Sequence, residues 1–295
     1  MPPTYGQARS PASAQRIHPL PAAHIIGAAT RRGTMFDKQT VEAITRGAVA
    51  ARLDPAAVLA VAEVESGGTA WALVEGRREP LIRWEGHYFD RRLKGRERET
   101  ARAASLAHPQ AGTIPNPRSQ AARWRILARA RALREDAALE STSWGIGQVM
   151  GAHWKALGFS DAGALASEAR SGVEGQARLM LRFIAHSGLD AALHREDWTG
   201  FARGYNGPGY AAGGYHTRIA GAFARHAPRT ALVETVRGER VRRMQAALGR
   251  VGQTLSADGV FGPNTALALR GFQAARGLVV DGIAGPRTLA ALRTV

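Results

Sequence analysis

The strongest constraint on how this chain folds is a repeat near its end. The stretches ADGVFGPNTALAL at 257–269 and VDGIAGPRTLAAL at 280–292 share one order: an Asp-Gly turn, a Gly-Pro entry and a short amphipathic helix. The copies are 23 residues apart, and the helical stretch ERVRRMQAALGRVG precedes the first. Because one supersecondary unit is repeated, we expect a separate small module over 236–295.

The preceding part of the chain has a helical rather than a strand-like pattern. Apolar residues recur at spacings of three and four, and Asp54-Pro55 is typical of an N-cap followed by the first helical residue. Alternation with a period of two is best over Leu81–Phe89, which predicts one strand or hairpin. We expect Gly- and Pro-bearing turns over 66–80 and 204–214. The predicted helices cover 40–51, 55–65, 119–134, 146–157, 173–187 and 216–226.

The first 34 residues differ from the rest in composition. They hold four Arg and no acidic residue, which predicts a flexible basic arm, or equally an over-extended start with Met35 as the initiator. No stretch of the chain reaches the roughly 18–20 apolar residues of a membrane span, and the N-terminus lacks the apolar centre of a secretory signal. The predicted organisation is therefore an arm over 1–34, a larger domain over 35–228, a linker over 229–235 and the module over 236–295.

Charge and cysteine content narrow the chemistry. Lys and Arg number 40 against 24 Asp and Glu, a net charge of +16 that favours an anionic partner: nucleic acid, a membrane surface or an acidic wall polymer. No nucleic-acid-binding motif accompanies the charge. The absence of Cys excludes thiol nucleophiles, Cys-bound zinc and iron–sulfur clusters, and the nine His form no HExxH motif. Each Asp-Gly turn offers one acid where a calcium loop needs several oxygens. We expect no metal or cofactor.

Glu65 is the first candidate for catalysis. It follows the apolar helical positions Val58, Val61 and Val64 and comes directly before Ser66-Gly67-Gly68. Burial at the end of such a helix raises the pKa of a carboxyl and lets it act as a general acid near neutral pH. On this evidence alone, a Glu near a helix end is more often a surface residue.

Two later stretches carry side chains suited to a sugar polymer. Residues 141–150, STSWGIGQVM, form a Ser/Gly-rich turn that is predicted to enter a helix carrying Gln148. Residues 205–210, YNGPGY, combine aromatic rings, an amide and a tight turn. Sugars are bound by flat aromatic faces and by groups that donate and accept hydrogen bonds. The residues offering these are Trp144, Gln148, Tyr205, Asn206 and Tyr210.

Taken in order, these motifs resemble a known superfamily. Glu65-Ser66, then Ser143-x-Gly145-x-Gly147-Gln148-x-Met150, then Tyr205-Asn206-Gly207-Pro208 follow the order found in goose-type lysozymes and soluble lytic transglycosylases. The chain is more similar to the N-acetylmuramidase endolysins of phages and prophages over about 55–226. That closer resemblance rests on Trp84-Glu85-Gly86-His87-Tyr88-Phe89, Ala137-Ala138-Leu139, Asp197-Trp198 and Phe201-Ala202-Arg203-Gly204-Tyr205-Asn206. One departure is the basic stretch over 91–102, where a less charged loop is expected.

The resemblance implies a lysozyme-like α+β domain that cleaves the β-1,4 bond between N-acetylmuramic acid and N-acetylglucosamine. Glu65 would be the general acid, and Ser143, Gln148, Tyr205, Asn206 and Tyr210 would bind substrate. Glycosidases usually use two carboxyls, and the candidates for the second are Glu85, Glu140 and Asp197. We favour Glu85, because it lies in the expected β element. Asp197 fits better as the N-cap of a helix starting at Trp198, and Glu140 as a solvent-facing or turn-ordering residue.

Residues 237–295 resemble the peptidoglycan-binding module found at the ends of many wall hydrolases. The match includes Met244-Gln245, Asp258-Gly259, Phe272-Gln273 and Asp281-Gly282. It implies a three-helix fold that holds wall glycan or peptide without catalysis. We therefore expect a mainly α, monomeric endolysin that is made in the bacterial cytoplasm and acts on peptidoglycan strands in the wall after release. The alternatives are a lytic transglycosylase that makes 1,6-anhydro products and a non-catalytic peptidoglycan-binding protein.

Overall fold

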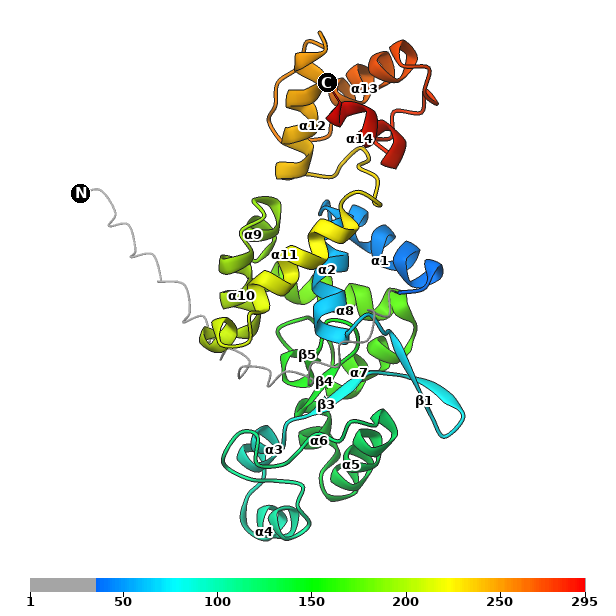
Figure 1. Cartoon of the computed structure of the whole chain (residues 1–295). Helices are drawn as coiled ribbons and strands as arrows, with labels where there is room; N and C mark the ends of the chain where they lie inside the picture. The colour runs from blue at the N-terminus through cyan, green and yellow to red at the C-terminus, as the bar shows by residue number, and fades with distance from the viewer. Residues whose placement is uncertain (1–35, 295) are drawn as a thin grey trace, which may run out of the picture.

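The computed structural model describes residues 36–294, so the predicted N-terminal arm over 1–34 lies outside the described residues. Buried apolar side chains form two clusters. The larger extends from Phe36 to Phe223 and the smaller from Leu232 to Leu292. Figure 1 shows the helices of the smaller cluster, in orange and red, above one end of the larger. No helix within residues 36–294 is both long and apolar enough to cross a bilayer.

The fold is mainly helical, as predicted. Short 3-10 helices cover Gly151–His153 (η1) and Pro208–Ala211 (η2). The helices around the larger cluster are α1 (Lys38–Ala50), α2 (Pro55–Ser66), α3 (Gly86–Arg92), α4 (Gly95–Ala103), α5 (Gln120–Leu133), α6 (Glu135–Glu140), α7 (Ala162–Arg170), α8 (Val173–His186), α9 (Asp190–His194), α10 (Trp198–Asn206) and α11 (Tyr215–His226). Those of the smaller cluster are α12 (Glu239–Arg250), α13 (Pro263–Ala275) and α14 (Pro286–Arg293), the three helices expected there.

Helix α2 is the central element of the larger cluster. Asp54 caps it by accepting a hydrogen bond from the Ala56 amide at 2.9 Å, and Pro55 occupies the first turn. Ala, Val and Leu side chains over 56–62 are buried on all sides, with α1 and α11 packed against them. The helix ends at Gly67, whose left-handed φ of 66° suits glycine. The last turn of α2, which carries Glu65, thus has a fixed position.

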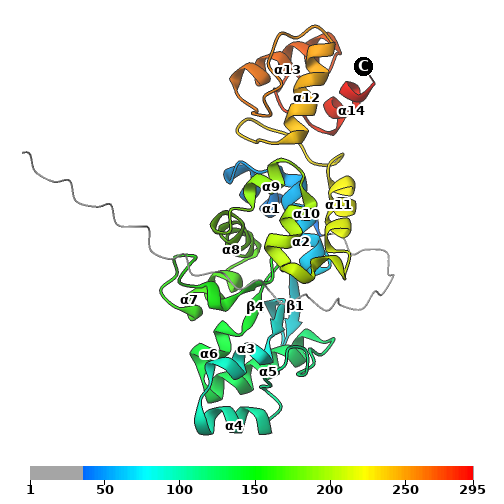
Figure 2. The same cartoon turned by 90° about the vertical axis from the view of Figure 1, so that its left-hand side faces the viewer.

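Two small antiparallel sheets lie below α2 in Figure 1. Strands β1 (Trp71–Val74) and β2 (Arg77–Pro80) form a hairpin whose two-residue turn, Glu75-Gly76, has positive φ at both residues, as in a type I′ turn. The second sheet has the order β3 (Ile82–Trp84), β4 (Thr142–Trp144) and β5 (Val149–Met150). The lower edge of this domain is formed by α3 to α6 (Figures 1 and 2).

Two sequence expectations were wrong in detail. Strand β3 covers only 82–84 of the strand predicted over Leu81–Phe89, because α3 begins at Gly86, and the hairpin lies instead over 71–80, where a turn was expected. The helix predicted over 146–157 is absent. Gln148 has a φ of 46° and the chain folds back, so that Ser143 pairs with Met150 before η1. A positive φ is incompatible with a continuing helix, so apolar spacing alone misled the prediction.

The repeat in the smaller cluster is built on two equivalent hydrogen-bond networks. In each, a buried Gln on a helix accepts a hydrogen bond from the glycine amide of an Asp-Gly turn and donates to three oxygens. Gln245 donates to Asp258, Val260 and Thr265 and accepts from Gly259. Gln273 donates to Asp281, Ile283 and Thr288 and accepts from Gly282. The repeated residues therefore order turns, which explains why the repeat contains them.

The two clusters are joined by direct polar contacts. Arg240 on α12 reaches Asp54 at the start of α2, with Nη1 to Oδ1 at 2.8 Å, and both side chains are about nine-tenths buried. Arg243 pairs with Glu196 at 2.6 Å. The segment over 229–235, expected to be a linker, is itself packed: Leu232 is fully buried and pairs with Ala284. The smaller cluster thus packs on the N-terminal end of α2.

Candidate active site

Glu65 lies in the last turn of α2 and contacts α11. The hydroxyl of Tyr215 donates a hydrogen bond to Oε1 of Glu65. Burial raises the pKa of Glu65 to about 7, although Tyr215 and the charges of Arg218 and Arg83 act in the opposite direction. The carboxyl is therefore substantially protonated near neutral pH, which is what a general acid requires.

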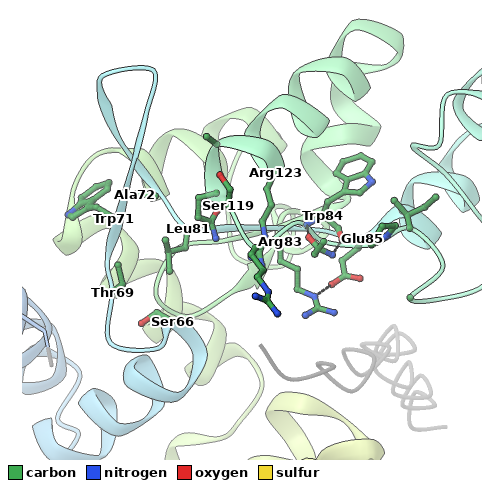
Figure 3. Close-up of a pocket in the computed structure, with 18 of the residues that line it drawn as sticks. Ser66, Thr69, Trp71, Ala72, Leu81, Arg83, Trp84, Glu85, Ser119 and Arg123 are labelled. Carbon is green, nitrogen blue, oxygen red and sulfur yellow. Dashed lines mark hydrogen bonds and ion pairs between the residues drawn. The ribbon is translucent and has the colours of Figure 1, made fainter. Parts of the chain in front are cut away.

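A groove of about 860 Å³ opens next to this helix end. Ser66 lines it from α2, and Figure 3 shows Ser66 on one side with Arg83 and Glu85 across from it. Trp71 and Leu73 of the hairpin line it, and so do residues of the segment over 112–123. The groove is thus assembled from parts of the chain that are distant in sequence.

Glu85 lines the groove at the end of β3. Its carboxylate accepts a hydrogen bond from Arg83 Nε at 2.7 Å, drawn as a dashed line in Figure 3. Burial raises the pKa of Glu85, and the Arg83 guanidinium opposes that rise. His87 Nδ1 lies 3.6 Å from the same carboxylate, and burial lowers the pKa of His87 to about 4, so the ring is neutral at pH 7. Since Arg83 also lowers the pKa of Glu65, one guanidinium influences both carboxyls.

Side chains, not a strand, complete the free edge of β3. Asn116 accepts from the Trp84 amide at 2.8 Å and donates to the Trp84 carbonyl at 2.7 Å. Gln120 accepts from the Ile82 amide at 2.9 Å, and Arg123 donates to the Ile82 carbonyl at 3.0 Å. These contacts fix the segment over 112–123 against the strand that carries Arg83 and ends at Glu85. They also leave few edge groups without a partner.

The residues predicted to bind substrate are not among those that line the groove. The hydroxyl of Ser143 is buried and contacts Met150 Sδ at 3.1 Å, and the Tyr205 hydroxyl donates to the Gly147 carbonyl at 2.6 Å. Gln148 donates to the Gly145 carbonyl at 2.8 Å. These three side chains hold the turn over 145–150, and their role in binding stays a prediction.

The remaining predicted binding residues lie at the end of α10 and beyond it. Asn206 is buried, whereas Tyr210 is partly exposed and meets the edge of His216 with ring centroids 5.5 Å apart. Trp144, considered as a sugar platform, is a buried core residue whose Nε1 donates to the Leu139 carbonyl at 3.3 Å. Because the ring of Trp144 is buried, no ligand can stack on its face.

The other two carboxylates considered have structural partners. Glu140 accepts from Arg92 at 2.7 Å and from Trp154 at 2.9 Å, so it orders the turn after α6. Asp197 caps α10 by accepting from the Gly200 amide at 2.8 Å, as expected. Neither of these two carboxylates lines the groove. Of the three candidates for a second catalytic carboxyl, Glu85 is the one that does.

Sequence reasoning missed Tyr215 and Arg83. Tyr215 lies 150 residues from Glu65 and begins α11, one residue before the predicted helix. No local motif connects these positions, so only the packing of α11 on α2 reveals the contact. Within residues 36–294, no group of three His, Asp or Glu is placed to hold a metal ion.

A carboxyl with a raised pKa at a helix end, near a groove lined by a second carboxyl, is an arrangement that glycoside hydrolases use. The chain belongs to the N-acetylmuramidase family, whose model matches residues 54–227. Residues 237–292 match the putative peptidoglycan binding domain. The chain is therefore a peptidoglycan-cleaving hydrolase with an attached wall-binding module.

A solved structure supports this assignment. The crystal structure of the Burkholderia AP3 phage endolysin shares 34% sequence identity with the chain and superposes with a TM-score of 0.55. The match covers 68% of this chain and 75% of that one. No curated protein matches the chain. Family and structure together identify an endolysin-type protein that acts on the bacterial cell wall.

Proposed function

We propose that the protein hydrolyses the β-1,4 bond between N-acetylmuramic acid and N-acetylglucosamine, with Glu65 as the general acid. The observation that carries the proposal is the buried carboxyl of Glu65 at the end of α2, directly before Ser66, which lines the groove. Burial raises its pKa to about 7, and the Tyr215 hydroxyl fixes the orientation of its carboxyl. A carboxylic acid that stays protonated near neutral pH can protonate a leaving sugar oxygen.

The reaction would proceed as an acid-assisted cleavage. The Glu65 proton passes to the glycosidic oxygen while the bond from that oxygen to the muramic C1 breaks and positive charge develops on the sugar ring. The Glu65 carboxylate that remains is stabilised by the Tyr215 hydrogen bond and by the charges of Arg218 and Arg83. Water then attacks C1, and Glu85 takes the proton that this water loses.

Glu85 is suited to this second role by its place and its partners. It lines the groove, and Arg83 holds one of its oxygens at 2.7 Å. We also propose that residues 35–228 carry the chemistry, that 236–295 hold the wall, and that 229–235 connect them. In the domain over 35–228, we propose that substrate binding is supported by the turn over 145–150 and by the end of α10. The residues involved are Ser143, Gln148, Tyr205, Asn206 and Tyr210.

Mass spectrometry of the products tests the proposal. Purified peptidoglycan is digested with the wild type, with Glu65→Gln, and with Glu99→Gln, which alters an exposed carboxyl on α4. We expect reducing muramic ends that have gained one water from the wild type and from Glu99→Gln, and almost none from Glu65→Gln. Products with a 1,6-anhydro ring would instead identify a lytic transglycosylase. Wall binding without any soluble fragments would identify a non-catalytic binder.

The role of Glu85 needs its own variant. Glu85→Gln keeps the size of the side chain and an oxygen that can accept from Arg83. If Glu85 takes the proton from water, hydrolysis falls by roughly 10²-fold or more while the pH limb set by Glu65 persists. Hydrolysis at the wild-type rate would exclude Glu85 and leave Glu65 as the one carboxyl required.

A further inference from the structure

The wall of the groove opposite Ser66 is strongly basic. Arg83, Arg118 and Arg123 line the groove, and Glu85 is the one acidic residue among the lining residues. Glu85 forms an ion pair with Arg83 and so neutralises one of these three positive charges. Arg118 is exposed and forms no ion pair within residues 36–294. The proposed cleavage does not use Arg118 or Arg123.

Arg123 is the most informative of the three. Its side chain is 9% exposed, and its hydrogen bonds go to carbonyl oxygens: Nε to Pro117 at 2.8 Å and Nη1 to Ile82 at 3.0 Å. Its Nη2 donates to no group within residues 36–294. A buried cation without an anionic partner at hydrogen-bond distance is costly. Burial and the nearby charge of Arg83 lower the pKa of Arg123, and the charge of Glu85 opposes that shift without a hydrogen bond to Arg123.

The start of α5 adds a second positive feature at the same wall. Ser119, Gln120 and Ala121 line the groove at the N-terminus of this 14-residue helix. Ser119 provides no side-chain cap, and the first turn contains no acidic residue. The free amides and the helix dipole at such an end attract anions. Arg118 precedes this end directly, and Arg123 lies one turn into the helix.

From this arrangement we propose that the start of α5, with Arg118 and Arg123, forms a subsite for a carboxylate carried by the muramic acid residue of the strand. The inference rests on the proposed function, because it assumes that the strand lies in this groove. Two sources offer the same chemistry: the acidic residues of the stem peptide, and the lactyl carboxylate of a strand whose peptide has been removed. A guanidinium paired with a carboxylate gives strong, charge-assisted hydrogen bonds. The subsite would make the enzyme select peptidoglycan over an uncharged glycan.

A binding experiment separates this inference from the cleavage chemistry. The probe is the muropeptide in which N-acetylglucosamine precedes a muramic acid that bears a tetrapeptide. It contains no bond from muramic acid to a following sugar, so it is not a substrate of the proposed reaction. Its affinity is measured by calorimetry for the full-length wild type, Arg118→Gln and Arg96→Gln. Arg96 is an exposed arginine on α4 outside the groove, so this control removes the same charge elsewhere.

We expect Arg118→Gln to weaken binding of the muropeptide by roughly 5- to 20-fold at low salt, and by less at high salt. Arg96→Gln should bind like the wild type. The same disaccharide without its peptide distinguishes the two sources, because its lactyl carboxylate is free, whereas in the peptide-bearing probe that carboxyl is bound in an amide. A loss confined to the peptide-bearing probe assigns the carboxylate to the stem, and a loss confined to the peptide-free disaccharide assigns it to the lactyl group; a loss on both shows that the subsite accepts either carboxylate. Equal affinity of the wild type and Arg118→Gln for both probes would overturn the proposal, whether or not Glu65 is the acid.

Discussion

Tyr215, the first residue of α11, donates its hydroxyl hydrogen to Oε1 of Glu65 in the last turn of α2. The contact stabilises the charged form of Glu65, so it restrains the rise in the pKa of Glu65 that burial causes. It also holds one oxygen of the carboxyl in place, directly before Ser66, which lines the groove. The proposed acid is therefore both tuned and oriented by one hydroxyl.

Replacement of Tyr215 by Phe removes this hydroxyl and keeps the ring in the core. We expect the pKa of Glu65 to rise further, so the alkaline limb of the activity profile moves to higher pH, and activity at pH 6 falls by roughly 10-fold because the carboxyl loses its orientation. The measurement is kcat/KM against pH. A merely structural role for Tyr215 would lower activity equally at every pH and leave the limb in place.

The raised pKa of Glu65 also predicts a pH-dependent cost in stability. From about pH 4.5 to about pH 7 the folded protein keeps a proton on Glu65 that the unfolded chain has lost, so the free energy of unfolding decreases as pH rises through this window. Over the whole window the free energy of unfolding falls by about 3 kcal/mol. Glu65→Gln removes this fall, so this variant should be more stable than the wild type at pH 8 and nearly equal to it at pH 4.5. Denaturant titration at both pH values measures the difference, and a difference that does not change with pH would refute the assignment.

The packing of the wall-binding module against the catalytic domain depends on the ion pair between Arg240 and Asp54. Arg240→Met leaves the Asp54 carboxylate buried without its cation, and we expect a loss of about 3–5 kcal/mol in the free energy of unfolding. Addition of Asp54→Asn should restore much of this loss, because Asn still accepts from the Ala56 amide as an N-cap. Arg243→Met, which breaks the more exposed pair with Glu196, is the matched control and should cost no more than about 1 kcal/mol. Equal effects of Arg240→Met and Arg243→Met would contradict a tightly seated module.

The two networks of the repeat predict a matched pair of effects. Gln245→Ala and Gln273→Ala each leave a buried glycine amide and several oxygens without their shared partner, at a cost of about 1–3 kcal/mol. Because the networks are equivalent, the two losses should be similar. Gln39→Ala, at an exposed position on α1, is the control. Thermal unfolding measures all three, and a loss at only one of the two repeat positions would show that the networks are not equivalent.

Local signals in the sequence were sufficient for much of the fold. The N-cap at Asp54, the helices around it and the three-helix module follow from short-range patterns that the structure confirms. The turn over 145–150 could not be predicted in this way, because its backbone depends on strand pairing and on a positive φ at Gln148. There, the apolar spacing of a helix was overridden by tertiary contacts.

The candidate site likewise has parts that local sequence patterns predict and parts that depend on long-range contacts. Glu65 and Glu85 could be proposed from neighbouring residues and family resemblance, whereas the groove itself could not. Its basic wall is held by side chains of Asn116 and Gln120 that satisfy the edge of β3, and its acid is oriented by a tyrosine 150 residues away. Contacts between residues so far apart in the sequence produce no local pattern from which they could be predicted.

The most direct test of the account is the rate at which Glu65→Gln releases reducing ends from purified peptidoglycan at pH 6, relative to the wild type. The variant keeps the shape of the side chain but has no proton to give, so we predict a fall of roughly 10²- to 10⁴-fold, with wall binding and folding intact. Glu99→Gln should retain the wild-type rate. A Glu65→Gln rate within about 3-fold of the wild type, well short of the loss of a general acid, would contradict the assignment of Glu65.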